Sequence, residues 1–158
     1  MQPPPPIPTS VEDLLQRARM LQRVAAKHAP AARPLAHKHI ALLAVDQASA
    51  AARLFHAAAT ELGADVARIV DGVPAMIDAG EPGKLGIWLG RFYQAIECQG
   101  LPPELVARLR NAAAVPVFDG LACDDHPTAA LAGFVDGGTQ DPESRKYVLQ
   151  AALVASMT

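Results

Sequence analysis

Short apolar runs alternate with helix-forming segments along most of this chain, and this alternation restricts its fold more than any other feature. The runs have the length of strands and are bounded by glycine, proline or aspartate. Four of them are expected to be strands: residues 40–45, 65–70, 95–98 and 115–118. The expected helices are residues 10 to about 29, 49–62, 84–93, 102–113, one that begins at Pro127, and 142–156. Strands that alternate with helices pair in parallel through right-handed crossovers. We therefore predict an α/β fold, a single three-layer domain whose four-stranded, mainly parallel sheet is flanked by helices.

The composition excludes several classes of function. The chain has 158 residues, of which 51% are hydrophobic and 19% charged, as is typical of one globular domain. Its formal net charge of −2 argues against a nucleic-acid surface, and its apolar runs are far shorter than the ~18 residues of a membrane span. Two cysteines, Cys98 and Cys123, are too few for a disulfide framework. We expect a cytoplasmic protein with no nucleic-acid or membrane partner.

The start of the chain, residues 1–9, is rich in proline and lacks the basic and apolar pattern of a leader peptide. We expect a disordered tail there, with a proline-recognition motif as the alternative. The first helix has a clear start signal, because Ser10 suits an N-cap and is followed by Glu12 and Asp13 in the first turn. Gly63 falls where a helix ends on a left-handed residue.

Residues 115–131 are the first candidate for a functional site. The strand at residues 115–118 is broken by Asp119-Gly120, and Pro127 suits the first turn of a helix because that position needs no backbone N–H. The crevice between strand ends and helix starts is the usual ligand site of an open α/β sheet. The imidazole of His126 is expected to project into this crevice.

Three blocks of sequence together resemble one family of enzymes. They are Leu89-Gly90-Arg91-Phe92-Tyr93-Gln94-Ala95-Ile96, Val115-Pro116-Val117-Phe118-Asp119-Gly120-Leu121, and His126-Pro127-Thr128-Ala129-Ala130-Leu131-Ala132-Gly133. Their counterparts are Leu-Gly-Arg-x-Tyr-x-x-Ile, Val-Pro-Val-x-Asn-Gly-Leu and His-Pro-x-Gln-x-Leu-Ala-Asp. The chain is thereby similar to the carbamoyl-phosphate domain of the aspartate/ornithine carbamoyltransferase family, nearest to the ornithine branch. Phe55 and Leu62-Gly63 also match, so the resemblance covers most of residues 10–136 and implies the fold of that domain.

The resemblance also implies a phosphate site that this chain has mostly lost. The family's phosphate loop, Ser-Thr-Arg-Thr-Arg, falls on Ala48-Ser49-Ala50-Ala51-Ala52, so that only Ser49 and the helix N-terminus remain. The arginine after the family's third strand corresponds to Gln99, and the glutamine of its His-Pro-x-Gln block corresponds to Ala129, while His126 is kept. Together these losses imply an affinity for carbamoyl phosphate that is lower by roughly 10³ to 10⁶.

Residues 143–155 are similar to the last helix of the family, which returns from the second domain and packs on the first. The family's intervening amino-acid-binding domain is here no longer than residues 136–140. The resemblance therefore implies an α/β domain at residues 10–136, completed by a linker and a returning helix at residues 137–158. Arg145 matches a family arginine that reaches the carbamoyl-phosphate site, with a helix-surface arginine as the alternative.

The other candidate residues are less informative. His37 and His39 are two positions apart and have no evident third ligand, so we expect no metal and no cofactor. Cys123 and His126 form a nucleophile pair only if the fold brings the thiol and the imidazole together. The remaining candidates are expected on helix surfaces or in the core: Arg53, His28, His56, and Trp88, for which an oligomer seam is the alternative.

Three functions stay open at this point. The first is a non-catalytic binding or assembly subunit with a vestigial substrate site at Ser49, His126, Pro127, Thr128 and Arg145. For such a subunit the resemblance implies a homotrimer or association with a full-length carbamoyltransferase. The second is a genuine transferase, similar to ornithine carbamoyltransferase, that works with residues of a partner subunit. The third is a site for another small anion at the N-terminus of the helix that follows Ser49.

Overall fold

A parallel four-stranded sheet forms the centre of the molecule, as the alternation of elements predicts. The computed structural model describes residues 10–27, 33–69, 81–135 and 142–158. The strands lie in the order β2-β1-β3-β4, and all neighbouring pairs are parallel. Their bounds are β1 His39–Ala44, β2 Asp65–Arg68, β3 Ala95–Gln99 and β4 Val117–Asp119. The helices are α1 Val11–Ala26, α2 Ala50–Glu61, α4 Pro82–Phe92, α5 Pro103–Ala112, η1 Pro127–Phe134 and α6 Pro142–Met157.

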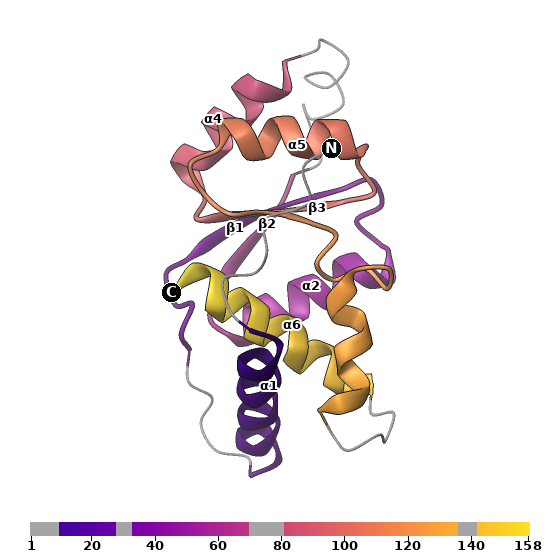
Figure 1. Cartoon of the computed structure of the whole chain (residues 1–158). Helices are drawn as coiled ribbons and strands as arrows, with labels where there is room; N and C mark the ends of the chain where they lie inside the picture. The colour runs from indigo at the N-terminus through magenta and orange to yellow at the C-terminus, as the bar shows by residue number, and fades with distance from the viewer. Residues whose placement is uncertain (1–9, 28–32, 70–80, 136–141) are drawn as a thin grey trace.

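Helices cover both faces of the sheet (Figure 1): α4 and α5 lie on one face, and α1, α2, η1 and α6 lie on the other. Side chains alternate along β1, so that Ile40 and Leu42 enter the core on the α2 and α6 side, and Ala41 and Leu43 enter the core on the α4 and α5 side. Coverage on both faces explains why this strand is an unbroken apolar run. The three-layer α/β prediction is confirmed.

The helix-end signals act as expected. The hydroxyl of Ser10, the predicted N-cap, accepts a hydrogen bond from the Asp13 N–H at 3.1 Å. The Ser49 hydroxyl, which was not predicted as a cap, accepts one from the Ala52 N–H at 3.1 Å. Gly63 has φ +96°, and a Cβ there would lie 3.0 Å from the Arg33 Cβ. A glycine is therefore required at the end of α2 both for its backbone conformation and for space.

Several predicted boundaries are wrong. β4 begins at Val117, two residues later than expected, because Pro116 has no N–H to donate to the ladder. The segment from Pro127 is a 3₁₀ helix, in which the Ala129 N–H donates to the His126 carbonyl three residues earlier. β1 begins one residue earlier than expected, at His39. The predicted tail at residues 1–9, the end of the first helix at 28–29 and the break at 136–140 lie outside the described residues.

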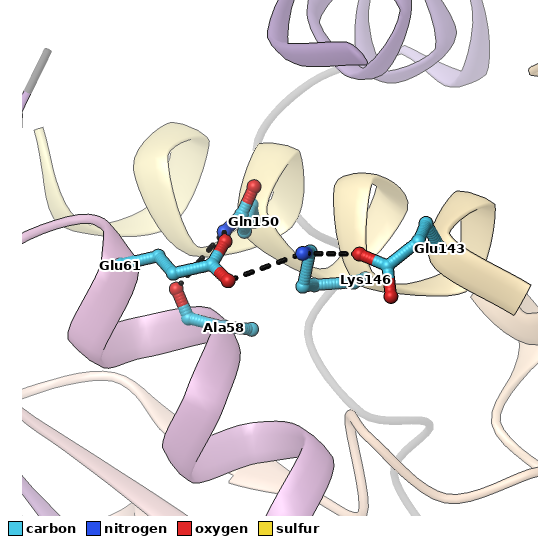
Figure 2. A network of polar contacts seen from close by, with 5 residues as sticks. All are labelled: Ala58, Glu61, Glu143, Lys146 and Gln150. Atoms are coloured by element: carbon cyan, nitrogen blue, oxygen red, sulfur yellow. Dashed lines mark hydrogen bonds and ion pairs between the residues drawn. The ribbon is translucent and has the colours of Figure 1, made fainter. Parts of the chain in front are cut away.

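The last helix packs against segments far from it in the sequence. α6 contacts α1, α2 and η1, and so completes the core on that side of the sheet. Figure 2 shows polar contacts between α6 and α2, in which Lys146 bridges Glu61 and Glu143 while Gln150 donates to Ala58 and Glu61. Across the described ranges, the helices are too short or too polar to cross a membrane.

Candidate functional site

The carboxyl ends of β1, β3 and β4 lie at one edge of the sheet, beside the N-terminus of α2 and the loop from Gly120 to His126. Gln99, the last residue of β3, joins two of these parts directly. Its side-chain N–H groups donate to the Ala51 carbonyl, in the first turn of α2, and to the Glu97 carboxylate, each at 3.2 Å. Gln99 is buried, so its amide fills the space next to the start of α2.

Glu97 is the central polar residue of this region, and sequence reasoning missed it. It lies in β3 and is fully buried. Its two carboxylate oxygens accept hydrogen bonds from the backbone N–H groups of Leu121, at 3.0 Å, and Ala122, at 3.1 Å. One signal was available, because an acidic side chain in the middle of an apolar strand must find buried donors. Glu97 thus ties the loop after β4 to the middle of the sheet.

The charge of Glu97 is only partly compensated. Burial raises the pKa of its carboxyl from an ordinary 4.5 to about 7, although the hydrogen bonds from Leu121, Ala122 and Gln99 act in the opposite direction. The carboxyl therefore exchanges its proton near neutral pH. No cation within the described ranges is hydrogen-bonded to it; Arg145 interacts with it only over a longer distance.

Arg145 of α6 reaches the same loop from the other side. Its guanidinium donates to the carbonyl of Leu121 at 2.6 Å and to that of Cys123 at 3.3 Å. Two further nitrogens, Nε and Nη1, are buried and have no hydrogen-bond partner among the described residues. Burial lowers the pKa of this arginine, while Asp124 and Glu97 oppose the shift. The side chain is thus half-buried against the loop.

His126 caps the 3₁₀ helix that follows the loop. Its Nδ1 accepts a hydrogen bond from the Thr128 N–H at 3.2 Å and lies 2.8 Å from the Thr128 hydroxyl. Burial, followed by the nearby charge of Arg145, lowers the pKa of the imidazole. Because Nδ1 acts as an acceptor, the neutral ring carries its proton on Nε2. Pro127 is exposed and Thr128 is buried beside the ring.

The thiol of Cys123 is not prepared for nucleophilic chemistry. Burial and the negative charges of Glu97 and Asp125 raise its pKa, whereas a reactive cysteine needs its pKa lowered. Cys98 is buried and its pKa is raised further. The geometry therefore gives no support to a cysteine and histidine pair.

The other predicted residues lie away from this region. His39 is exposed and lies 3.7 Å from the Asp65 carboxylate, and no group of three metal-ligating side chains occurs in the part of the chain that the structure describes. Arg53 is exposed on α2, and His56 is half-buried on the same helix. His28 is outside the described residues. Trp88 is half-exposed on α4 and packs against Phe92.

At the N-terminus of α2, the features that bind a phosphate are few. The Ser49 hydroxyl is occupied as the helix cap, and Ala50 and Ala51 follow it without donors in their side chains. Bare helix N–H groups attract anions, but the tight sites in proteins add cationic or hydroxyl side chains. Arg145 and Thr128, the cationic and hydroxyl side chains of the predicted site, contact the Leu121 carbonyl and the His126 ring instead.

Sequence comparisons show the origin of this architecture. The catabolic ornithine carbamoyltransferase of Burkholderia mallei is 38% identical over 123 residues, which make up 75% of this chain and 35% of that protein. That of Malacoplasma penetrans is 36% identical over 103 residues, or 65% of this chain and 30% of that protein. The chain thus spans about a third of the length of these curated relatives. A scan against protein-family models finds no match.

Solved structures agree at the level of the fold. The catalytic subunit of M. jannaschii aspartate transcarbamoylase superposes with a TM-score of 0.64 at 20% identity, covering 79% of this chain and 41% of that one. The ornithine carbamoyltransferase of Burkholderia thailandensis superposes with a TM-score of 0.62 at 20% identity, covering 79% of this chain and 43% of that one. The matching blocks of sequence and the shared parallel sheet lead to one conclusion: the chain belongs to the aspartate/ornithine carbamoyltransferase family, of whose members it covers about one domain.

Proposed function

We propose that this chain is a carbamoyltransferase-family domain in which the residues of the former substrate site now stabilise a loop and helix ends. We propose further that it acts as a binding or assembly subunit rather than as a catalyst. The observation that supports this most is the use of Arg145. Its guanidinium donates to the carbonyls of Leu121 and Cys123, so the arginine that matches a substrate-binding residue of the family holds a loop.

The residues around Arg145 are consistent with the same proposal. Gln99 fills the space beside α2 with an amide that is bonded to Ala51 and Glu97. His126 and Ser49 each cap a helix. The side chains of the vestigial site thus stabilise the edge of the sheet. The first three residues of α2 are alanines and so supply no cationic side chain for a doubly charged phosphate, and Arg53, the fourth, is exposed.

The proposal predicts that carbamoyl phosphate does not bind at millimolar concentration in isothermal titration calorimetry, with a complete ornithine carbamoyltransferase as the positive control. The double variant Ala50→Arg and Gln99→Arg returns two cations and should bind carbamoyl phosphate measurably, at least about tenfold more tightly than the unchanged chain. The reason is that each charge-assisted hydrogen bond contributes ~1.5–3 kcal/mol. Ala57→Arg, on an exposed position of α2, serves as the matched control and should not bind.

A second function is favoured by one observation. Gln99 Oε1 and two nitrogens of Arg145 are buried without partners among the described residues, all at the same edge of the sheet. A ligand could satisfy them, and residues of a partner subunit could then complete a transferase site. Micromolar binding of carbamoyl phosphate by the unchanged chain, abolished by His126→Ala or Arg145→Ala, would establish this function and overturn the first.

An assembly role requires a surface for a partner. Helix α4 presents the half-exposed side chains of Ile87, Trp88 and Phe92, and the rings of Trp88 and Phe92 are 5.1 Å apart. Contiguous exposed apolar side chains mark interaction surfaces. We place self-association, or association with a full-length carbamoyltransferase, on this face of α4.

We expect a trimeric mass in sedimentation at tens of micromolar, or a complex with a full-length carbamoyltransferase. Trp88→Glu combined with Phe92→Glu should lower the sedimenting mass to that of the monomer, because charges cannot be buried at an apolar contact. Val45→Glu, another exposed apolar position, controls for added charge. A monomeric mass both alone and with the full-length enzyme would contradict the assembly role.

A further inference from the structure

A cavity of about 260 Å³ lies between α1 and α6, far from the edge of the sheet described above. Its walls are mostly apolar and include Met20, Leu21 and Val24 from α1 and Ala151 and Val154 from α6. Met20 is 59% exposed, so α1 is incompletely covered on this side. Apolar cavities of ~150 Å³ already hold a benzene-sized molecule.

Gln150 is one of four polar residues in the lining of this cavity, with Arg17, Glu61 and Tyr147, and it is only 3% exposed. Its side-chain nitrogen donates to the Ala58 carbonyl at 3.2 Å and to the Glu61 carboxylate at 2.9 Å, so both N–H groups are used. These two acceptors determine the orientation of the amide, because the reverse orientation would place its oxygen against two other oxygens. Figure 2 shows the Gln150 oxygen pointing away from Glu61 and toward the side on which α1 lies.

The environment of Glu61 strengthens this arrangement. Lys146 bridges Glu61 and Glu143 and so keeps the Glu61 carboxylate in place as the acceptor for Gln150. The oxygen of Gln150 accepts no hydrogen bond from any residue that the structure describes. A donor that enters the cavity can therefore bind to this oxygen.

We propose that this cavity binds a small, neutral, apolar molecule that carries one N–H or O–H donor directed at the Gln150 oxygen. The mostly apolar walls favour a neutral group, since they would not compensate the desolvation of a charge. The two charged residues of the lining, Arg17 and Glu61, have opposite signs. The size suits a bicyclic aromatic or a branched alkyl group, and the Gln150 oxygen selects for a donor. This site is independent of the function proposed above for the edge of the sheet.

The test compares two probes that differ in one group. Indole has an N–H donor, and benzofuran has an oxygen in its place. In chains labelled with ¹³C at the methionine methyl groups, titration should shift the Met20 signal with saturation. Indole should bind about fivefold more tightly than benzofuran, in line with one net hydrogen bond. Equal affinities, or shifts that do not saturate at millimolar concentration, would overturn the proposal.

Two variants separate the site from general apolar binding. Gln150→Met removes the acceptor and should bring the ratio of the two affinities to about one; a retained fivefold ratio would contradict the role of Gln150. Ala25→Trp fills the cavity from an exposed position of α1 and should lower the affinity for indole at least about tenfold. Gln16→Trp, on α1 but outside the cavity lining, is the matched control and should bind indole as the unchanged chain does.

Discussion

Replacing Glu97 with alanine is expected to lower the free energy of unfolding by about 4 kcal/mol near pH 6. The backbone N–H groups of Leu121 and Ala122 would lose their acceptors, and both residues are buried. An unsatisfied buried donor costs ~1–3 kcal/mol, and the missing side chain leaves a cavity in the centre of the molecule. Removing a partly ionised buried carboxyl offsets some of this loss.

Urea unfolding followed by circular dichroism measures the change. Glu104→Ala is the matched control, because Glu104 is exposed on α5 and its loss should change the stability by less than about 1 kcal/mol. If the two variants unfolded at the same urea concentration, Glu97 could not be the residue that holds the loop to β3.

The stability of the unchanged chain is expected to fall as the pH rises from about 4.5 to about 8. The folded chain holds the proton of Glu97 up to a pKa of about 7, whereas the ordinary value is 4.5. Between these values the folded state binds more protons than the unfolded state, so deprotonation favours unfolding. The difference corresponds to about 3 kcal/mol, present below pH 4.5 and lost by the time the pH has passed 7.

Comparison with Glu97→Gln isolates this effect from other titrating groups. The lowered pKa of His126 acts in the opposite direction, because a histidine that loses its proton more readily when folded destabilises the fold as the pH falls. Both chains keep His126, so its contribution cancels in the difference. Glutamine retains the volume and one acceptor but cannot ionise. Parallel stability curves for the two chains between pH 4.5 and 8 would show that Glu97 titrates normally.

Local signals predicted the elements of this fold well. The Ser10 hydroxyl caps the start of α1 through a residue three positions away, and the left-handed Gly63 follows the end of α2. The unbroken apolar run of β1 correctly indicated a strand that is covered on both faces. The start of β4 was placed two residues too early because the missing N–H of Pro116 was not taken into account. The 3₁₀ form of η1 was not predicted either, because the packing of the loop decides it.

The candidate site was predicted less completely. Resemblance pointed to Arg145 and His126, and the structure brings both to one loop. Glu97 was missed because its partners, Leu121 and Ala122, are 24 and 25 positions away, and no spacing rule connects them. Gln99 was recognised only as a replaced arginine, whereas its amide joins α2 to Glu97.

The sequence by itself determined the order of strands and helices, their parallel pairing and the membership of a carbamoyltransferase family, because apolar periodicity, helix caps and motif blocks are properties of neighbouring residues. Only the tertiary structure decided how the polar groups are used. Arg145 binds backbone carbonyls, Glu97 binds backbone amides, and Gln150 directs its oxygen toward α1. Each of these depends on segments that meet only when the chain is folded, where burial makes every unpaired donor or acceptor costly.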